Sequence, residues 1–170
     1  MRFWKHQVDW RLRKLFKCIP LTYFCCVLPF PISFSNGRLF SIGISGTFPA
    51  CNSYSSLTTS DRLVSYAASS SKCDSGLRNK WYRFVEKAGT SMPEICPPRR
   101  RCSANAPGWL NGKHPTVEEG EVTRTVCFQY GASCCRWSKD VKVFNCSGFY
   151  VYKLPNVPGC YLRYCGKSHG

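Results

Sequence analysis

Strand-like patterning dominates the central and C-terminal parts of the chain. Three regions combine β-branched and aromatic residues at lengths typical of strands: residues 80–85, residues 121–130, and the pair 141–145 and 149–154. The last two segments flank Ser147-Gly148 and offer apolar side chains to one buried face, so the sequence predicts a β-hairpin there.

Helix signals are weaker than strand signals. Ser60-Asp61 supplies an N-cap for one short helix. Turn signals at residues 106–108 and 111–112 bracket what we expect to be a short buried anchor between two loops. The pattern predicts a mainly β domain with little helix.

The number and spacing of the cysteines indicate the cellular compartment in which the protein folds. Of the 13 cysteines, three lie in an apolar N-terminal stretch and ten lie between Cys51 and Cys165. Ten cysteines at close, irregular spacings are typical of a small disulfide-rich extracellular domain, so we expect five disulfides. A bond between the adjacent Cys134 and Cys135 would close a strained ring, so each is expected to have another partner.

A metal site or a redox dithiol is the alternative for a cysteine-rich chain. Both usually place two cysteines in a C-x-x-C turn, which this sequence lacks. His114 is the one histidine within the cysteine span, so a zinc site would leave most thiols unexplained. We expect no metal and no cofactor.

The N-terminal residues 1–35 have the order of a secretory signal peptide, with a basic opening followed by an apolar run over residues 18–34. Cleavage is expected after Ser35, with Gly37 as the second candidate. An uncleaved signal anchor is the alternative, although three prolines in the apolar run disfavour a regular membrane helix. The expected localisation is secreted, with membrane attachment only if the leader stays.

The remaining chain divides into three parts. Residues 36–50 contain glycine, proline and serine and are expected to form a flexible lead-in. Residues 51–166 form the ten-cysteine domain, which is long enough for one modest core supported by cross-links. Residues 167–170 are expected to be a frayed tail.

Positive charge is high throughout. The formal net charge is +15, and residues 51–170 hold 17 Lys or Arg and eight Asp or Glu, a balance of +9. Such a balance favours anionic glycans, mucus, bacterial envelopes or nucleic acid as partners. The densest run, Arg99-Arg100-Arg101, lies between two cysteines and is a candidate anion-binding loop. A solvated loop and a dibasic processing site are the alternatives.

Several segments together resemble a known extracellular domain. The resemblance begins with CDSGLRNKWYRFVEKAGTSMPEICPP and continues with APGWLNGKHP, EGEVTRTVCF, CCRWS, NCSGFYVYKL and CYLRYCG. In order and spacing, these segments resemble the ten-cysteine domain of the uromodulin and zymogen-granule membrane glycoprotein family. The similarity covers about two thirds of the chain. It implies an extracellular disulfide-rich module, and it does not extend to growth-factor or filament-forming modules.

The resemblance also implies a disulfide scheme that the residues alone leave open among hundreds of pairings. The implied pairs are Cys51–Cys146, Cys73–Cys160, Cys96–Cys134, Cys102–Cys165 and Cys127–Cys135.

Vertebrate members of this family display an N-linked glycan on the domain, which bacterial adhesins bind. This sequence departs from them, because Lys153 stands at the sequon position and the NGK at residues 111–113 lacks the hydroxyl residue. One sequon remains, NCS at residues 145–147, so Asn145 is a candidate N-glycosylation site. The alternative is a strand-end asparagine that hydrogen-bonds locally.

Few residues of the sequence are suited to a catalytic role. His114 is expected to be a turn residue instead of a general base, and no convergent nucleophile accompanies it. Glu118, Glu119 and Glu121 lack the spaced oxygen ligands of a calcium loop and are expected to form a solvated turn. Three tryptophans are candidates for stacking on sugars, although packing against disulfides is the commoner role. They are Trp81, Trp109 and Trp137.

Taken together, these features predict a secreted, non-enzymatic interaction or display module, acting in host defence or the extracellular matrix. The expected partner is an extracellular protein or glycan, including a microbial surface, and not a nucleic acid. The alternative is a basic protein that binds anionic bacterial surfaces or mucus directly, which salt sensitivity would reveal. A small hydrolase dependent on His114 is a third class.

Overall fold

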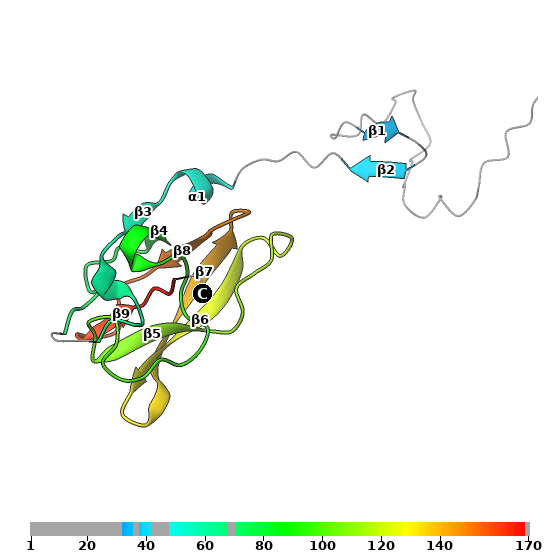
Figure 1. Ribbon diagram of the computed structural model, residues 1–170. Helices are drawn as coiled ribbons and strands as arrows, with labels where there is room; N and C mark the ends of the chain where they lie inside the picture. The colour runs from blue at the N-terminus through cyan, green and yellow to red at the C-terminus, as the bar shows by residue number, and fades with distance from the viewer. Residues whose placement is uncertain (1–31, 36–37, 42–47, 68–70, 169–170) are drawn as a thin grey trace, which may run out of the picture. The chain divides into compact units, whose positions relative to one another are not determined.

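The computed structural model describes residues 32–35, 38–41, 48–67 and 71–168 (Figure 1). The chain divides into two units, residues 1–45 and residues 46–170. In the first unit, β1 (Ile32–Ser35) and β2 (Arg38–Ser41) pair as an antiparallel hairpin. Most of the expected leader lies outside the described residues. Within the part of the chain that the structure describes, no helix has the length and apolar character needed to cross a bilayer.

The second unit is built on one seven-stranded sheet with the order β3-β4-β8-β7-β6-β5-β9. The central strands β4, β8, β7, β6 and β5 are antiparallel, whereas β3 joins β4 and β9 joins β5 in parallel. The strands are β3 (Ser55–Leu57), β4 (Lys80–Phe84), β5 (Ala106–Asn111), β6 (Val122–Tyr130), β7 (Ser133–Asn145), β8 (Tyr150–Leu154) and β9 (Leu162–Tyr164). The helical elements are α1 (Pro49–Asn52) and the 3-10 turns η2 (Ser60–Arg62) and η3 (Glu86–Ala88).

The mainly β fold class is confirmed, and β4, β6 and β8 lie close to their predicted bounds. The β7–β8 hairpin is also present, but β7 begins at Ser133, eight residues before the predicted start. The expected short helix is only the 3-10 turn η2. Alternating apolar side chains of the central strands fill the core because they face one side of the sheet. Its members include Phe84, Leu110, Val126, Phe128, Val143 and Tyr152.

The segment over residues 106–108 is part of strand β5, although its sequence predicts a turn. Gly108 explains why a strand fits there. A Cβ at this position would lie 2.8 Å from the Phe128 ring and 2.9 Å from the carbonyl oxygen of Arg163. Because only glycine leaves room, β5 can pass close to the core and pair with β6 and β9.

Both ends of the predicted domain are more ordered than expected. Phe48, assigned to the flexible lead-in, stacks on Phe144 with ring centroids 4.0 Å apart and meets the edge of Trp81 at 5.5 Å. Lys167, assigned to the frayed tail, donates its backbone N–H to the carbonyl oxygen of Ser91 at 2.6 Å. The packed unit therefore includes residues on both sides of the predicted 51–166 boundaries.

Four disulfides cross-link the described residues, and they are four of the five pairs that the resemblance implies. They are Cys51–Cys146, Cys96–Cys134, Cys102–Cys165 and Cys127–Cys135. The adjacent Cys134 and Cys135 thus have different partners, which agrees with the ring-strain argument.

The fifth expected pair, Cys73 with Cys160, is not bonded in the structure, where both are free cysteines. The Cys73 thiol donates instead to the carbonyl oxygen of Gly159 at 3.5 Å. Burial opposes ionisation of this thiol, but hydrogen bonds involving Ser75 and Cys160 outweigh burial and lower its pKa. Among the described residues the structure therefore contains four of the five expected disulfides.

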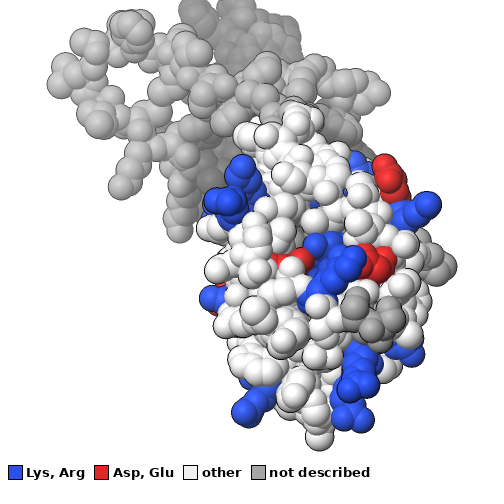
Figure 2. Space-filling model, turned by 90° about the vertical axis from the view of Figure 1, so that its left-hand side faces the viewer, with Lys and Arg blue, Asp and Glu red and all other residues white. Residues whose placement is uncertain are grey.

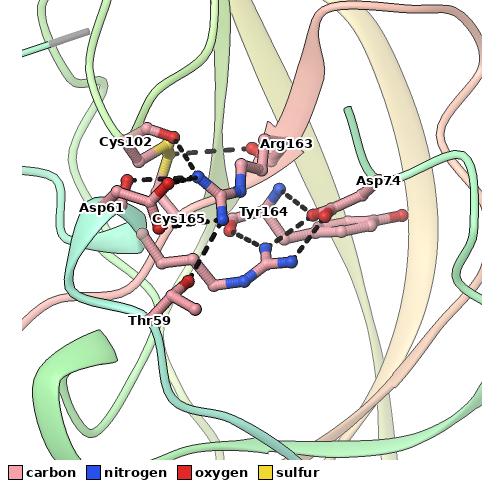
Figure 3. The surroundings of a disulfide bond; sticks show 8 residues. Thr59, Asp61, Asp74, Cys102, Arg163, Tyr164 and Cys165 are labelled. Atoms are coloured by element: carbon pink, nitrogen blue, oxygen red, sulfur yellow. Dashed lines mark hydrogen bonds and ion pairs between the residues drawn. A yellow bond between two sulfur atoms is a disulfide. The ribbon is translucent and has the colours of Figure 1, made fainter. Parts of the chain in front are cut away.

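Two buried arginines hold the C-terminal strand β9 to the segment around η2. Arg62 binds both carboxylate oxygens of Asp74 at 2.8 and 2.6 Å, and Asp74 also accepts the backbone N–H of Tyr164 at 2.9 Å. Arg163 donates to the Asp61 carboxylate at 3.1 Å and lies beside the Cys102–Cys165 disulfide (Figure 3). Every charge in this cluster is paired, which offsets the cost of burying it.

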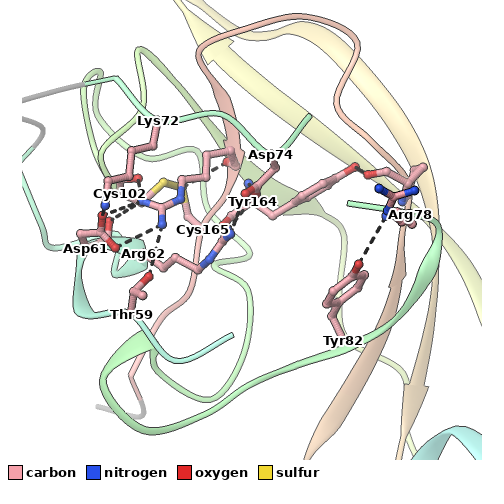
Figure 4. Close-up of polar contacts among 12 residues, drawn as sticks. Thr59, Asp61, Arg62, Lys72, Asp74, Arg78, Tyr82, Cys102, Tyr164 and Cys165 are labelled. Carbon is pink, nitrogen blue, oxygen red and sulfur yellow. Dashed lines mark hydrogen bonds and ion pairs between the residues drawn. A yellow bond between two sulfur atoms is a disulfide. The ribbon is translucent and has the colours of Figure 1, made fainter. Parts of the chain in front are cut away.

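Lys72 completes the cluster from the solvent side, 2.6 Å from Asp61 (Figure 4). Burial raises the pKa of Asp61, but the hydrogen bonds from Arg163 and Lys72 outweigh burial and hold that pKa well below its usual range. The carboxylate therefore stays charged as the shared acceptor of two cations.

Candidate functional site

Two adjoining hollows lie where the loop before β5, the β6–β7 turn and the segment before β9 meet. The larger has a volume of about 690 Å³ and includes Arg99 and Arg100 in its lining. The smaller has a volume of about 360 Å³ and includes Trp137 and Tyr161. Asn105 and Tyr130 line both hollows, so we treat them as one surface and call it the Tyr130 groove. The other lining residues are Pro98, Ala106, Gly131, Gly159, Cys160 and Leu162.

Three exposed aromatic rings define the groove. Tyr130, Trp137 and Tyr161 are 51%, 38% and 55% exposed, although large rings usually bury most of their surface. The rings of Tyr130 and Trp137 lie 5.5 Å apart between centroids and are tilted by 56°. The two ring faces therefore form an angled surface that is exposed to solvent.

Cross-links hold the rings and the arginine loop in place. Cys127–Cys135 joins β6 to β7 next to the turn that carries Tyr130, and Cys96–Cys134 joins the loop to the same strand. The indole Nε1 of Trp109 donates to the carbonyl oxygen of Cys134 at 2.8 Å. The groove is therefore already ordered before a ligand binds, which lowers the entropic cost of binding.

The three consecutive arginines have two different environments. Arg101 donates to the carbonyl oxygen of Ser65 at 3.1 Å, and its backbone bridges to Ala67. Arg99 and Arg100 are exposed, and within the described ranges neither side chain has a hydrogen-bond or ion-pair partner. Of the predicted anion-binding loop, the first two arginines thus line the groove, and the third stabilises the loop.

The electrostatics of the Tyr130 groove favour anions. None of its lining residues is Asp or Glu. A further cation, Arg136, has its guanidinium carbon 6.0 Å from the centroid of the Trp137 ring, within cation–π range. Guanidinium groups bind oxyanions through paired N–H donors, and aromatic faces bind flat or weakly polar surfaces. The groove can therefore hold a ligand that combines both chemistries.

Positive charge is not gathered in one place on the surface. On the face shown in Figure 2, Lys and Arg side chains form separate groups, and acidic side chains adjoin some of them. The acidic cluster predicted as a solvated turn is also paired, with Glu119 3.1 Å from Arg124 and Glu121 bonded to Lys142. No group of three or more His, Cys, Asp or Glu suited to a metal occurs among the residues that the structure describes.

His114 serves the fold. Its Nδ1 lies 2.6 Å from Glu94 and its Nε2 lies 2.7 Å from the hydroxyl of Tyr152, while its side chain is only 7% exposed. Burial lowers the pKa of His114, although Glu94 acts in the opposite direction. This chain of groups holds the loop after β5 against β8 and opens onto no cavity of those described above.

Glu94 was not predicted from the sequence. Burial disfavours its charged form, but hydrogen bonds from His114 and Lys113 outweigh burial and lower its pKa from 4.5 to about 2. It therefore remains an ionised acceptor for the imidazole.

The candidate glycosylation site lies at the end of β7. The Asn145 amide nitrogen donates to the carbonyl oxygen of Pro115 at 3.0 Å, and its oxygen accepts the backbone N–H of Ser147 at 3.0 Å. Cys146 is bonded to Cys51. The contact with Ser147 is of the local kind expected of a strand-end asparagine, whereas the contact with Pro115 joins two distant segments, and Asn145 does not line the groove.

Of the three tryptophans considered for sugar stacking, two are occupied within the fold. Trp81 meets Phe48, and Trp109 hydrogen-bonds to Cys134. Only Trp137 offers its ring to the groove. Its neighbours Tyr130, Tyr161 and Asn105 were missed, because only the pairing of β5 with β6 and β9 places these positions together.

Comparison with known proteins supports an extracellular family. A family model described as a uromodulin-like domain matches residues 82–166. The chain is 47% identical over 116 residues to uromodulin from Mus musculus, which covers 68% of this chain and 18% of that protein. It is 43% identical over 120 residues to the pancreatic secretory granule membrane major glycoprotein GP2 from Canis lupus familiaris, covering 70% of this chain and 23% of that protein. The chain thus spans less than a quarter of the length of these relatives.

Proposed function

This chain belongs to the uromodulin-like domain family, and from that premise we propose that it is a secreted, non-enzymatic module that binds an extracellular partner. The family is one of extracellular glycoprotein domains, which agrees with the localisation expected from the sequence. The proposed role is to present a rigid binding surface outside the cell.

One observation carries the proposal. The Tyr130 groove combines two unpartnered guanidinium groups with three exposed rings on a frame held by disulfides. Exposed aromatic and arginine side chains are the residue types most enriched where binding energy concentrates. Among the described residues Arg99 and Arg100 have no hydrogen-bond or ion-pair partner, and the three rings keep much of their surface exposed, so a ligand would account for their arrangement.

The non-enzymatic part of the proposal rests on the surroundings of His114, the one candidate general base. His114 is enclosed between Glu94 and Tyr152, both of which hold it by hydrogen bonds. A general base must reach the proton that it removes. An imidazole held in this way stabilises the loop instead.

Asn145 provides a second route to display. N-linked glycosylation replaces one of the two amide hydrogens, which leaves one to donate to Pro115. A glycan at Asn145 would therefore add a second displayed feature outside the groove. We also propose that the leader is removed after Ser35, so that the domain is released.

The alternative function is a basic protein that binds anionic bacterial surfaces or mucus through its overall charge. The balance of +9 over residues 51–170 supports it. Charge-driven binding depends on the number of cations more than on their position, and it weakens as salt screens the charges. The partner, a microbial surface or a matrix component, decides between host defence and a matrix role.

The test is a binding screen of the protein secreted by eukaryotic cells against arrays of extracellular proteins and glycans, at low and high salt. We expect saturable binding to a limited set of partners, and we expect Tyr130→Ala with Trp137→Ala to abolish it while secretion is retained. Enzymatic removal of any N-glycan from the protein separates binding through Asn145 from binding through the groove. Binding to every polyanion alike, lost at high salt and unaffected by the ring substitutions, would support the alternative.

A further inference from the structure

We propose that the ligand of the Tyr130 groove is a sulfated oligosaccharide. This inference rests on the proposed function, since it assigns a chemical class to the partner of the same groove. It concerns direct binding by protein side chains, and it is independent of any glycan that the protein itself carries.

The charge of the groove requires an anionic ligand. Arg99 and Arg100 are exposed and unpartnered among the described residues, and no carboxylate lines either hollow. A planar guanidinium presents paired N–H donors that match the oxygens of an oxyanion. Two consecutive arginines that line the same hollow, and that have no partner among the described residues, are therefore suited to one or two anionic groups of a ligand.

The loop geometry makes this pair of cations ready to bind. Cys96 and Cys102 flank the arginines, and each is bonded to a distant strand or segment, through Cys134 and Cys165. Arg100 has φ of 55°, a conformation that few side-chain-bearing residues adopt without support from their surroundings. Because the backbone is already held, binding would restrict little beyond the two side chains.

The aromatic rings favour a sugar as the carrier of the anion. A pyranose ring has hydroxyl groups at its edge and C–H groups on its faces, so it matches an exposed aromatic face surrounded by polar groups. Tyr130, Trp137 and Tyr161 offer such faces, and the two tyrosine hydroxyls and the Asn105 amide offer polar groups at the rim. The tilt of 56° between Tyr130 and Trp137 gives two surfaces for neighbouring sugar rings.

An acidic peptide fits the groove less well. Peptides gain affinity by adding a strand to an open sheet edge, by laying apolar side chains into a groove, or by placing acidic groups on an arginine cluster, and only the last mode is open to the Tyr130 groove. The edge strand β9 has only three residues, and its Leu162 is buried in the core. The groove instead presents open ring faces, which suit a carbohydrate.

Sulfate is favoured over a carboxylate as the anionic group. A sulfate ester has three terminal oxygens, so it can accept hydrogen bonds from more than one guanidinium group. It also keeps its charge over the whole physiological pH range. The two adjacent cations of the groove, which no carboxylate neutralises, match that charge density.

The experiment is a calorimetric titration of the protein secreted by eukaryotic cells, at about 0.15 M salt, with a defined sulfated oligosaccharide and with the same backbone after desulfation. We expect the sulfated form to bind at least about tenfold more tightly, since charge-assisted hydrogen bonds are the stronger ones. Arg99→Ala with Arg100→Ala should weaken binding of the sulfated form about tenfold or more. Tyr130→Ala should weaken it about fivefold to tenfold, whereas Tyr130→Phe should keep most of the affinity.

A matched control removes two positive charges outside the groove. Arg78 and Lys80 are exposed, line neither hollow, and have no side-chain partner among the described residues. Replacing both by Ala should change affinity by less than about threefold, because only long-range attraction is lost. Far-UV circular dichroism and non-reducing peptide maps confirm that each variant keeps its sheet and its disulfides.

Three outcomes would overturn the inference. One is an equal loss of affinity in the Arg99/Arg100 and Arg78/Lys80 variants, which would mean diffuse attraction. Another is binding that does not depend on sulfation. The third is tighter binding of an acidic peptide or a single-stranded oligonucleotide of the same charge, which would assign the groove to that class. If the sugar fails but the array screen finds another partner that needs Tyr130, the proposed function stands and only this inference falls.

Discussion

The arginines of this domain have two contrasting fates. Arg62 and Arg163 are 8% and 4% exposed and are bound to carboxylates and carbonyl oxygens at the base of β9. Arg99 and Arg100 are exposed and unpartnered among the described residues. The Cys102–Cys165 disulfide is close to both pairs in the sequence, because Arg163 lies just before Cys165 and Arg99 and Arg100 lie just before Cys102. One cross-link therefore supports both regions. The contrast teaches that the partner of an arginine, more than its place in a basic run, separates a structural role from a binding role.

The largest expected effect comes from breaking the buried pair. Asp74→Ala would leave the Arg62 guanidinium buried without its carboxylate and would remove the acceptor of the Tyr164 N–H. We expect a loss of about 3–5 kcal/mol in unfolding free energy and poor secretion. Chemical denaturation of the secreted protein, or its yield where none folds, measures this. A loss below about 1 kcal/mol would contradict the structural role assigned to the cluster.

A smaller effect is expected at His114. Removing the imidazole by His114→Ala deletes hydrogen bonds to Glu94 and Tyr152, at a cost of about 1–3 kcal/mol. The measurement is denaturant unfolding at neutral pH. Neither the wild type nor this variant is expected to hydrolyse model substrates, and a hydrolytic activity lost with His114 would contradict the non-enzymatic proposal.

The same residues predict a pH profile. The pKa of His114 is lowered in the folded state, so the unfolded chain binds more protons and stability falls as pH drops below about 6.5. The pKa of Glu94 is also lowered, to about 2, so its contribution is present above 4.5 and is lost between 4.5 and 2. Thermal unfolding midpoints should therefore fall in two stages on acidification. His114→Ala should remove the upper stage, and a profile flat from pH 7 to pH 5 in the wild type would contradict the first assignment.

The free cysteines give a still smaller effect. With both thiols unbonded as in the structure, Cys73→Ser should cost less than about 1 kcal/mol, because serine can keep the hydrogen bond to Gly159. Cys102→Ser, which opens a disulfide, should cost about 2–5 kcal/mol and serves as the control. Equal losses in both variants, or peptide maps that join Cys73 to Cys160, would restore the fifth disulfide of the implied scheme.

The smallest effect on stability is expected in the groove itself. Arg99→Ala with Arg100→Ala removes exposed side chains that have no hydrogen-bond or ion-pair partner among the described residues, so unfolding free energy should change by less than about 0.5 kcal/mol. The large effect of this variant should appear only in ligand binding. A thermal shift comparable to that of Asp74→Ala would mean that these arginines belong to the structural class after all.

The sequence predicts those features whose signal is local. The arginine loop is one, because its position between two cysteines indicates a stapled, exposed segment. The strands β4, β6 and β8 are others, because their β-branched and aromatic content is visible over five residues or more. The first half of β7 carries no such signal: Cys134-Cys135-Arg136-Trp137 is exposed throughout, and its pairing with β6 and the disulfides hold it in the sheet.

The groove is a different case. Tyr130, Asn105 and Tyr161 carry no shared motif, and they lie together because β9 joins β5 in parallel beside the β6–β7 hairpin. Parallel pairing between short edge strands leaves little trace in composition. The buried pairs Arg62–Asp74 and Arg163–Asp61 were missed for the same reason, since each depends on a tertiary contact.

The parallel attachment of β9 also has a consequence for biosynthesis. Ala106 pairs with Leu162, and Lys167 pairs with Ser91, so the C-terminal described segment completes contacts with residues made much earlier. Such non-local closure is slow, and one sheet edge and the thiol of Cys102 stay exposed until it occurs. We therefore expect oxidation to wrong partners to compete with folding until Cys165 bonds to Cys102.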